Sequence, residues 1–128
     1  MRTLAKDYRE NVEFMDRTLR VAESFDVLCK TLRLPDGELS LYFIDGFVKD
    51  TVMQKLMTHF LSVKKMPPTA GDFMRSSLPY VETDVTADVD VMIQMVMSGA
   101  TLVLGSSFGD EAIIIDSRTY PARETAEL

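Results

Sequence analysis

The chain has 128 residues and a formal net charge of −6, from 14 lysines and arginines against 20 aspartates and glutamates. This length suits one domain with a hydrophobic core, and the ordinary apolar (46%) and charged (27%) fractions exclude a disordered chain. The acidic balance argues against a nucleic-acid-binding protein, and the single cysteine, Cys29, leaves no partner for an internal disulfide. We expect a soluble intracellular domain, because no apolar run approaches the ~20 residues of a membrane-spanning helix.

The N-terminal third predicts a helix followed by a hairpin. Apolar residues recur at helical spacing from Tyr8 to Ala22, with charges between them. Two apolar runs, 26–33 and 38–44, then flank Pro35-Asp36-Gly37, which is typical of a tight turn because proline presets φ and glycine allows a positive φ. The second run is apolar on both faces, so we expect that strand to lie inside the sheet.

Two helices are predicted next. Asp50 is placed to cap the first of them, since its carboxylate can accept a hydrogen bond from a free N–H of the first turn. Apolar residues repeat at helical spacing after it, and the sequence Met66-Pro67-Pro68 ends the helix. A shorter helical segment is expected from Ala70 to Ser77.

The remainder alternates between strands and one helix. A short strand at 80–83 precedes a helix that Asp84 or Thr86 caps and that Gly99 ends. Two apolar strands, 101–104 and 111–115, follow and are joined by a glycine-containing loop.

This order of strands and helices predicts right-handed crossovers. We therefore expect an α/β fold: a mixed, partly parallel sheet of about five strands, with helices packed on it. The expected organisation is an N-terminal amphipathic helix (1–23), an α/β core domain (24–118) and the start of a linker (119–128).

Polar residues follow three of the predicted strands, and they are the candidate ligand site: Asp45 and Gly46, Asp84, and Ser106 with Ser107. In open α/β sheets, ligands bind in the crevice beyond the carboxyl ends of the strands. Carboxylates and hydroxyls there could receive a small amine or cation. The same residue types are also ordinary turn formers, so both readings stand.

Residues 105–109 (GSSFG) match the G-x-S-x-G pattern of a hydrolase nucleophile elbow, with Ser107 as the nucleophile. That elbow needs a helix after the turn, whereas 111–115 predicts a strand. The single histidine, His59, is expected on the polar face of a distant helix. A hairpin loop explains the motif better, and a small hydrolase is a remote alternative. No metal or cofactor site is expected, because no ligand set shows the spacing of a zinc or calcium site.

Four segments resemble the GerA family of spore germination proteins. Residues 41–50 (LYFIDGFVKD) are similar to the family's Y-[IF]-D-G-x-V-x-[DK] signature. Residues 24–27 (SFDV), 79–82 (PYVE) and 114–123 (IIDSRTYPAR) resemble its S-x-D-[VI], P-Y-[VI]-E and I-D-[AS]-R-x-[YW]-P-x-R segments, in the same order. After residue 123 the sequence departs from the glycine and acidic run with which the family usually continues.

The resemblance implies a cytoplasmic N-terminal module of a protein of the spore inner membrane, followed in full-length members by a second subdomain and membrane helices. It implies a role in germinant sensing, or in assembly and signal coupling, with B- and C-type subunits or related proteins as partners. The resemblance is also compatible with assembly into a homo-oligomer and with binding of a small-molecule germinant. It brings no catalytic residue and no cofactor. The structural or coupling residues that it implies are Asp50, Arg118, Tyr120, Pro121 and Arg123.

Overall fold

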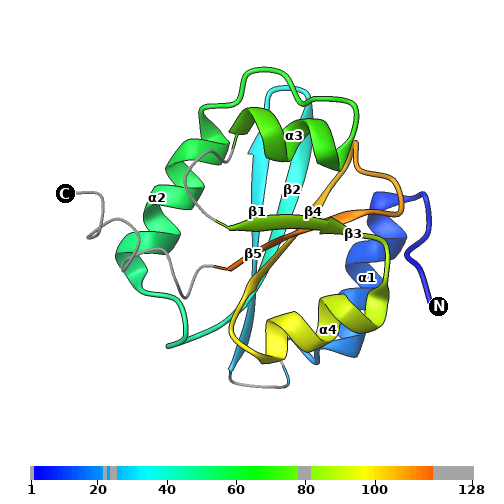
Figure 1. The fold of residues 1–128 in the computed structure, drawn as a ribbon, viewed down its shortest axis with the longest axis vertical. Coiled ribbons are helices and arrows are strands. Elements are labelled where there is room, and N and C mark those ends of the chain that lie inside the picture. Colours follow the sequence, from blue (N-terminus) through cyan, green and yellow to red (C-terminus); the bar gives the residue numbers. More distant parts are fainter. Residues whose placement is uncertain (1, 22, 24–25, 78–81, 117–128) are drawn as a thin grey trace.

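The computed structural model describes residues 2–21, 23, 26–77 and 82–116. In this part of the chain the helices are α1 (Tyr8–Thr18), α2 (Asp50–Leu61), α3 (Ala70–Ser77) and α4 (Val89–Met97). The strands are β1 (Val27–Leu34), β2 (Gly37–Ile44), β3 (Thr83–Thr86), β4 (Thr101–Gly105) and β5 (Ala112–Ile115). Figure 1 shows one strongly twisted sheet with helices on both of its faces.

The strand order is β1-β2-β4-β5-β3, and each neighbouring pair is antiparallel. The α/β class is confirmed, but the prediction of a partly parallel sheet was wrong. The reason lies between β2 and β4, where two helices, an edge strand and a third helix bring the chain back to the end of the sheet at which β2 finishes. β4 therefore enters beside β2 in the opposite direction, and no single-helix crossover forms.

The predicted β1–β2 hairpin is confirmed. Leu34 pairs with Gly37 around a two-residue loop, and β2 lies inside the sheet between β1 and β4. Gly37 is not among the described residues with a positive φ. A Cβ at Gly37 would clash with Sδ of Met66 and lie 2.6 Å from Oγ of Ser106, so close packing, rather than the turn conformation, favours glycine here. The carboxylate of Asp36 accepts the Met66 N–H at 3.0 and 3.2 Å from its two oxygens.

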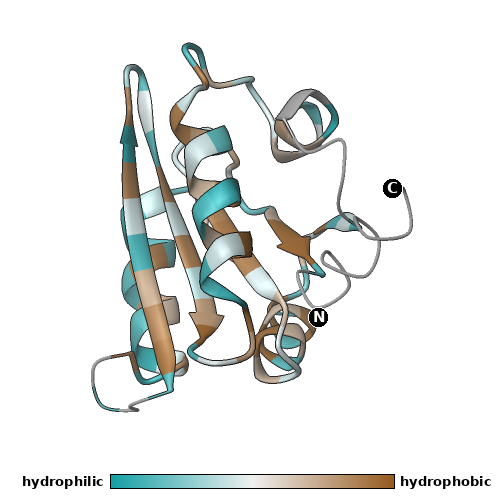
Figure 2. Ribbon diagram, turned by 90° about the vertical axis from the view of Figure 1, so that its left-hand side faces the viewer, coloured by the Kyte–Doolittle hydropathy of each residue, from teal (hydrophilic) through white to brown (hydrophobic). Residues whose placement is uncertain are grey.

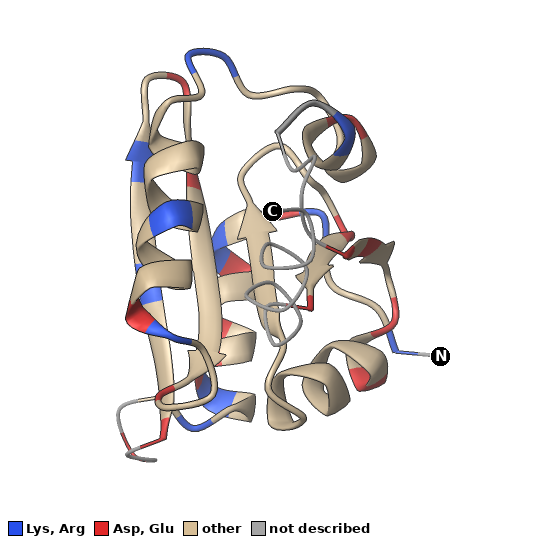
Figure 3. Cartoon of the chain, turned by 60° about the vertical axis from the view of Figure 1, so that its left-hand side comes forward, with Lys and Arg blue, Asp and Glu red and all other residues tan. Residues whose placement is uncertain are grey.

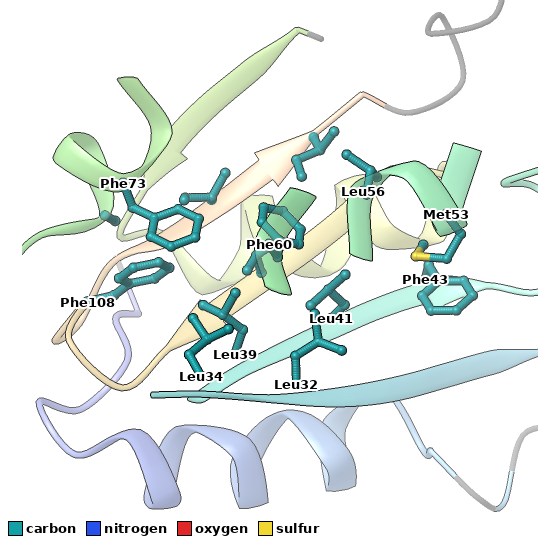
Figure 4. Packing of buried hydrophobic residues seen from close by; sticks show 14 of the residues in the cluster. Leu32, Leu34, Leu39, Leu41, Phe43, Met53, Leu56, Phe60, Phe73 and Phe108 are labelled. Carbon is teal, nitrogen blue, oxygen red and sulfur yellow. The ribbon is translucent and has the colours of Figure 1, made fainter. Parts of the chain in front are cut away.

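Each face of the sheet carries its own hydrophobic core. On one face, α2 and α3 cover inward side chains of β1, β2, β4 and β5. Figure 4 shows the rings of Phe60, Phe73 and Phe108 meeting here, with ring centroids 5.7 Å apart for Phe60–Phe73 and 5.4 Å apart for Phe73–Phe108. On the other face, α1 and α4 cover a second set that includes Tyr42 and Leu102. The molecule is thus a helix–sheet–helix sandwich, and in Figure 2 α2 lies in front of the sheet and α1 lies behind it.

Two predicted helix caps and one predicted strand boundary need correction. Asp50 lies in the first turn of α2, where its charge suits the helix dipole, and the N-cap is Lys49 without a side-chain hydrogen bond. The strand expected at 80–83 is observed as β3, three residues later, and it contains Asp84. Asp88, rather than Asp84 or Thr86, caps α4, since its carboxylate accepts the Asp90 N–H at 2.9 Å.

Candidate functional site

Asp45 and Gly46 form the turn in which β2 ends and the chain leads toward α2. The N–H of Asp45 donates to the Asp26 carbonyl (2.8 Å), and the N–H of Phe47 donates to the Ile44 carbonyl (3.1 Å). Gly46 has a φ of +92°, a conformation that glycine adopts without strain. The side chains of Asp45 and Phe47 are exposed, with Phe47 53% accessible. The turn therefore presents a carboxylate and an aromatic ring on a fixed backbone.

Ser106 and Ser107 lie at the opposite end of the sheet, in the loop between β4 and β5. Oγ of Ser106 accepts the N–H of Glu38 (3.0 Å), and the hydroxyl of Ser107 donates to the carbonyl of Pro67 (2.8 Å). These contacts join the β4–β5 loop to the start of β2 and to the α2–α3 connection. Both serines thus hold loops together.

The G-x-S-x-G motif is a hairpin loop, as predicted, because β5 follows it instead of a helix. A Cβ at Gly105 would lie 2.7 Å from the ring of Phe108, which is buried in the core. Packing against this ring therefore requires the first glycine of the motif. The second, Gly109, has a φ of +65° and so serves the turn itself.

The candidate ligand residues do not form one crevice. β4 and β5 lie between β2 and β3, and at the usual strand spacing Asp84 is about 14 Å from β2. Asp45 follows the last residue of β2, whereas Ser106 bonds to its second residue, so the length of the strand separates them. The prediction of a single crevice assumed parallel strands whose carboxyl ends meet at one edge of the sheet. That prediction was wrong, because the neighbouring strands are antiparallel. Ligand binding at any one of these loops stays a prediction.

The predicted coupling residues beyond Asp50, which are Arg118, Tyr120, Pro121 and Arg123, lie outside the described residues.

A polar cluster between α1 and the sheet was not predicted. Tyr42 of β2 is fully buried and donates its hydroxyl to Oδ1 of Asp16 (2.8 Å) and to the carbonyl of Val12 (3.3 Å). The hydroxyl of Tyr8 lies 2.6 Å from Oγ of Ser40. Ser40 and Tyr42 lie two residues apart on β2, so their side chains point to the same face of the sheet and their hydroxyls face the same helix. Two hydroxyl-bearing residues at this spacing within an apolar strand were the sequence signal that could have revealed the cluster.

Burial favours the neutral forms of the two tyrosines in this cluster and of the nearby Cys29 thiol. Burial raises the pKa of Tyr42 far above its ordinary value, and the Cys29 and Asp16 side chains nearby raise it further. Burial also raises the pKa values of Tyr8 and of the Cys29 thiol. The cluster therefore suits a structural contact and gives no activated nucleophile, since the reactive form of cysteine is the thiolate.

Asn11 of α1 is a second buried polar residue that the sequence did not reveal. Its Oδ1 accepts the N–H of Ala5 (2.8 Å), and its Nδ2 donates to the carbonyls of Ala5 (2.9 Å) and Gly109 (3.2 Å). One side chain thus fixes the N-terminal segment and the β4–β5 loop to α1.

The described residues contain no group of three or more His, Cys, Asp or Glu side chains that could hold a metal ion. Within the same part of the chain, no helix has the length and apolar character needed to cross a membrane.

Three comparisons place the chain among known proteins. The model of the Bacillus/Clostridium GerA spore germination protein family matches residues 15–127. The chain is 28% identical over 123 residues to stage V sporulation protein AF of Bacillus subtilis (strain 168), covering 92% of this chain and 24% of that protein. Its fold is similar to the crystal structure of the N-terminal domain of the A subunit of the Bacillus megaterium spore germinant receptor GerK3. That match has a TM-score of 0.69 at 13% identity and covers 91% of this chain and 48% of the other.

The chain spans about a quarter of the length of this curated relative and about half of the solved chain. The structural match supports the helix–sheet–helix fold, and the family assignment rests on the family model, which begins within α1 and extends past β5. The chain therefore belongs to the Bacillus/Clostridium GerA family of spore germination proteins.

Proposed function

We propose that this chain is a non-enzymatic module of a spore germination membrane protein, acting in germinant sensing or in assembly and signal coupling of the germination complex. The observation that supports this proposal best is the family match over residues 15–127. The segment 41–50 adds a physical reason. Its first half is buried in β2, whereas its Asp45–Phe47 turn is exposed and held by two backbone hydrogen bonds, where another protein or a ligand can contact it.

The proposed setting is the cytoplasmic side of the spore inner membrane, with B- and C-type subunits or related proteins as partners. Assembly of the protein with copies of itself is part of the same proposal. We propose no enzymatic activity, because the hydroxyl of Ser107 is bonded to the Pro67 carbonyl and no base is adjacent to it among its described contacts.

Co-purification from spore membranes tests the assembly role. A tagged full-length protein should recover other germination subunits, and Asp45→Ala should lower their yield because it removes the exposed carboxylate of the turn. Glu10→Ala is the matched control, since Glu10 is an exposed carboxylate on α1, away from that turn. Equal recovery with Asp45→Ala and wild type would refute a partner contact at this turn.

Direct germinant binding is the second candidate, because the Asp45 carboxylate is exposed and makes no ion pair with a described residue. Thermal unfolding of the chain against amino acids, sugars, nucleosides and salts tests it. A ligand at about 10 mM with a dissociation constant near 1 mM stabilises by roughly 1.4 kcal/mol, which raises the Tm by a few degrees. A selective shift that Asp45→Ala abolishes would support sensing by this chain, and a flat panel would refute it.

A further inference from the structure

The two edges of the sheet are not equivalent. β3, at one edge, has four residues, and the N-terminal segment lies beside its far end. There Thr3 forms a bridge with Asp88, and the Val89 N–H donates to the Arg2 carbonyl (2.9 Å). β1, at the other edge, has eight residues, contains no proline and pairs with β2 along its whole length. Among the described residues, no element pairs with the outer side of β1, which is the outermost strand in Figure 2.

The backbone of β1 offers a regular row of free hydrogen-bonding groups. The Asp45 N–H donates to the Asp26 carbonyl, and these two residues extend the β1–β2 register by one pair. In an antiparallel ladder hydrogen-bonded pairs alternate with non-bonded ones, so the even-numbered residues of β1 bond to β2. The N–H and C=O groups of the odd-numbered residues point outward: 27, 29, 31 and 33.

The side chains of this edge are basic and partly apolar. β1 contains Lys30 and Arg33 and no acidic residue, although the whole chain has a net charge of −6. Both basic side chains are exposed, and neither forms an ion pair with a described residue. Leu28 lies two residues before Lys30 on the same face and is 36% exposed. Figure 3 shows the basic positions along this outer strand.

We propose that the free edge of β1 binds an extended segment of a partner protein, which adds to the sheet as an antiparallel strand. The segment carries acidic side chains opposite Lys30 and Arg33 and an apolar side chain opposite Leu28. Positions 28, 30 and 32 would be non-bonded pairs with the new strand, where facing side chains come closest. Acidic and apolar partners at these positions therefore contribute most.

Charge complementarity selects this occupant over a second copy of β1. Two β1 strands side by side would place four basic residues and no acidic residue along one ladder, and these like charges would repel one another. A free edge strand such as β1 is a template for the addition of a further strand. β3 is less suitable, because it is short and the N-terminal segment bonds to the chain just beyond its end.

A synthetic peptide, Glu-Val-Thr-Glu-Thr-Val-Thr, tests the proposal, because its register places the two glutamates opposite Arg33 and Lys30. The readout is the amide spectrum and the hydrogen exchange of the 128-residue chain at millimolar peptide. We expect shifts and slower exchange at the outward amides of Cys29, Thr31 and Arg33. A peptide with lysines in place of both glutamates should bind about tenfold more weakly.

Two variants separate strand addition from general attraction. Thr31→Pro removes an outward N–H without removing a bond to β2, so it should abolish binding, while Thr31→Val should bind as wild type. Combined Lys30→Glu and Arg33→Glu keeps the backbone intact and should reverse the preference to the lysine peptide. No shift with the acidic peptide, equal binding of both peptides, or concentration-dependent dimerisation through β1 would each overturn the proposal.

Discussion

Replacing Asn11 tests how the N-terminal segment is held. In Asn11→Ala, the Ala5 N–H, the Ala5 carbonyl and the Gly109 carbonyl lose their side-chain partner. Each hydrogen bond contributes about 0.5–1.5 kcal/mol, but Asn11 also lines an open cavity of about 300 Å³ through which water can reach part of the site. We therefore expect a loss of about 2 kcal/mol, which lowers the Tm by roughly 6–10 °C.

Asn11→Asp makes the prediction sharper because it keeps the acceptor for the Ala5 N–H but turns a negative charge toward two carbonyl oxygens. Burial and this repulsion raise the pKa of the new carboxyl above its unfolded value of about 3.9. The Asn11→Asp variant is therefore most stable below pH ~3.9, and its stability falls as the pH rises through the folded-state pKa of the new carboxyl. At pH 7 Asn11→Asp should be less stable than Asn11→Ala, and near pH 3.5 this order should reverse.

Urea unfolding of both variants at the two pH values gives the free energies of unfolding. A free energy of unfolding for Asn11→Ala within about 0.5 kcal/mol of wild type, the usual range for surface substitutions, would refute this role of Asn11. The same order of the two variants at both pH values would also refute it.

Three further predictions concern the core, the buried hydroxyl and the loop. Phe60→Ala should cost about 3–5 kcal/mol, because Phe60 is fully buried against Phe73, and a loss under 1 kcal/mol in urea unfolding would contradict this. Since Tyr42 has a raised pKa, its stabilisation is complete below pH ~10 and decreases above it, so the urea midpoint should fall more between pH 9 and pH 11 in wild type than in Tyr42→Phe. Equal falls would contradict that assignment. Ser107→Ala should cost about 1 kcal/mol through the lost bond to Pro67, and wild type should show no ester turnover; turnover that this substitution abolishes would restore the hydrolase alternative.

The local elements could be predicted where one periodicity dominated. The Pro35-Asp36-Gly37 turn between two apolar runs predicted the β1–β2 hairpin, and the helical repeat predicted α2 and its end before Pro67. Strand direction could not be predicted in this way, because it depends on where several connecting elements return the chain. Gly37 illustrates the same limit, since the close packing that favours glycine there involves Met66 and Ser106, which are distant in sequence.

The candidate site was predicted less well than the fold. Asp45, Gly46, Ser106 and Ser107 follow strands as predicted, whereas Asp84 lies within β3. The antiparallel sheet distributes these residues over opposite ends and an edge. Asn11 and Asp16 occupy polar positions between the apolar residues of the predicted N-terminal helix. Only tertiary packing shows that Asn11 bonds to the N-terminal segment and that Asp16 bonds to Tyr42. A polar residue on a helix does not reveal in sequence whether water or a buried partner will satisfy it.

The most direct test of the proposed role is the germination rate of spores that carry the full-length protein with Asp45→Ala or Arg123→Ala. Asp45 is exposed, so Asp45→Ala should leave the Tm of the chain within about 2 °C of wild type. We expect slower germination with both variants at normal protein levels. Wild-type germination rates in both would contradict it.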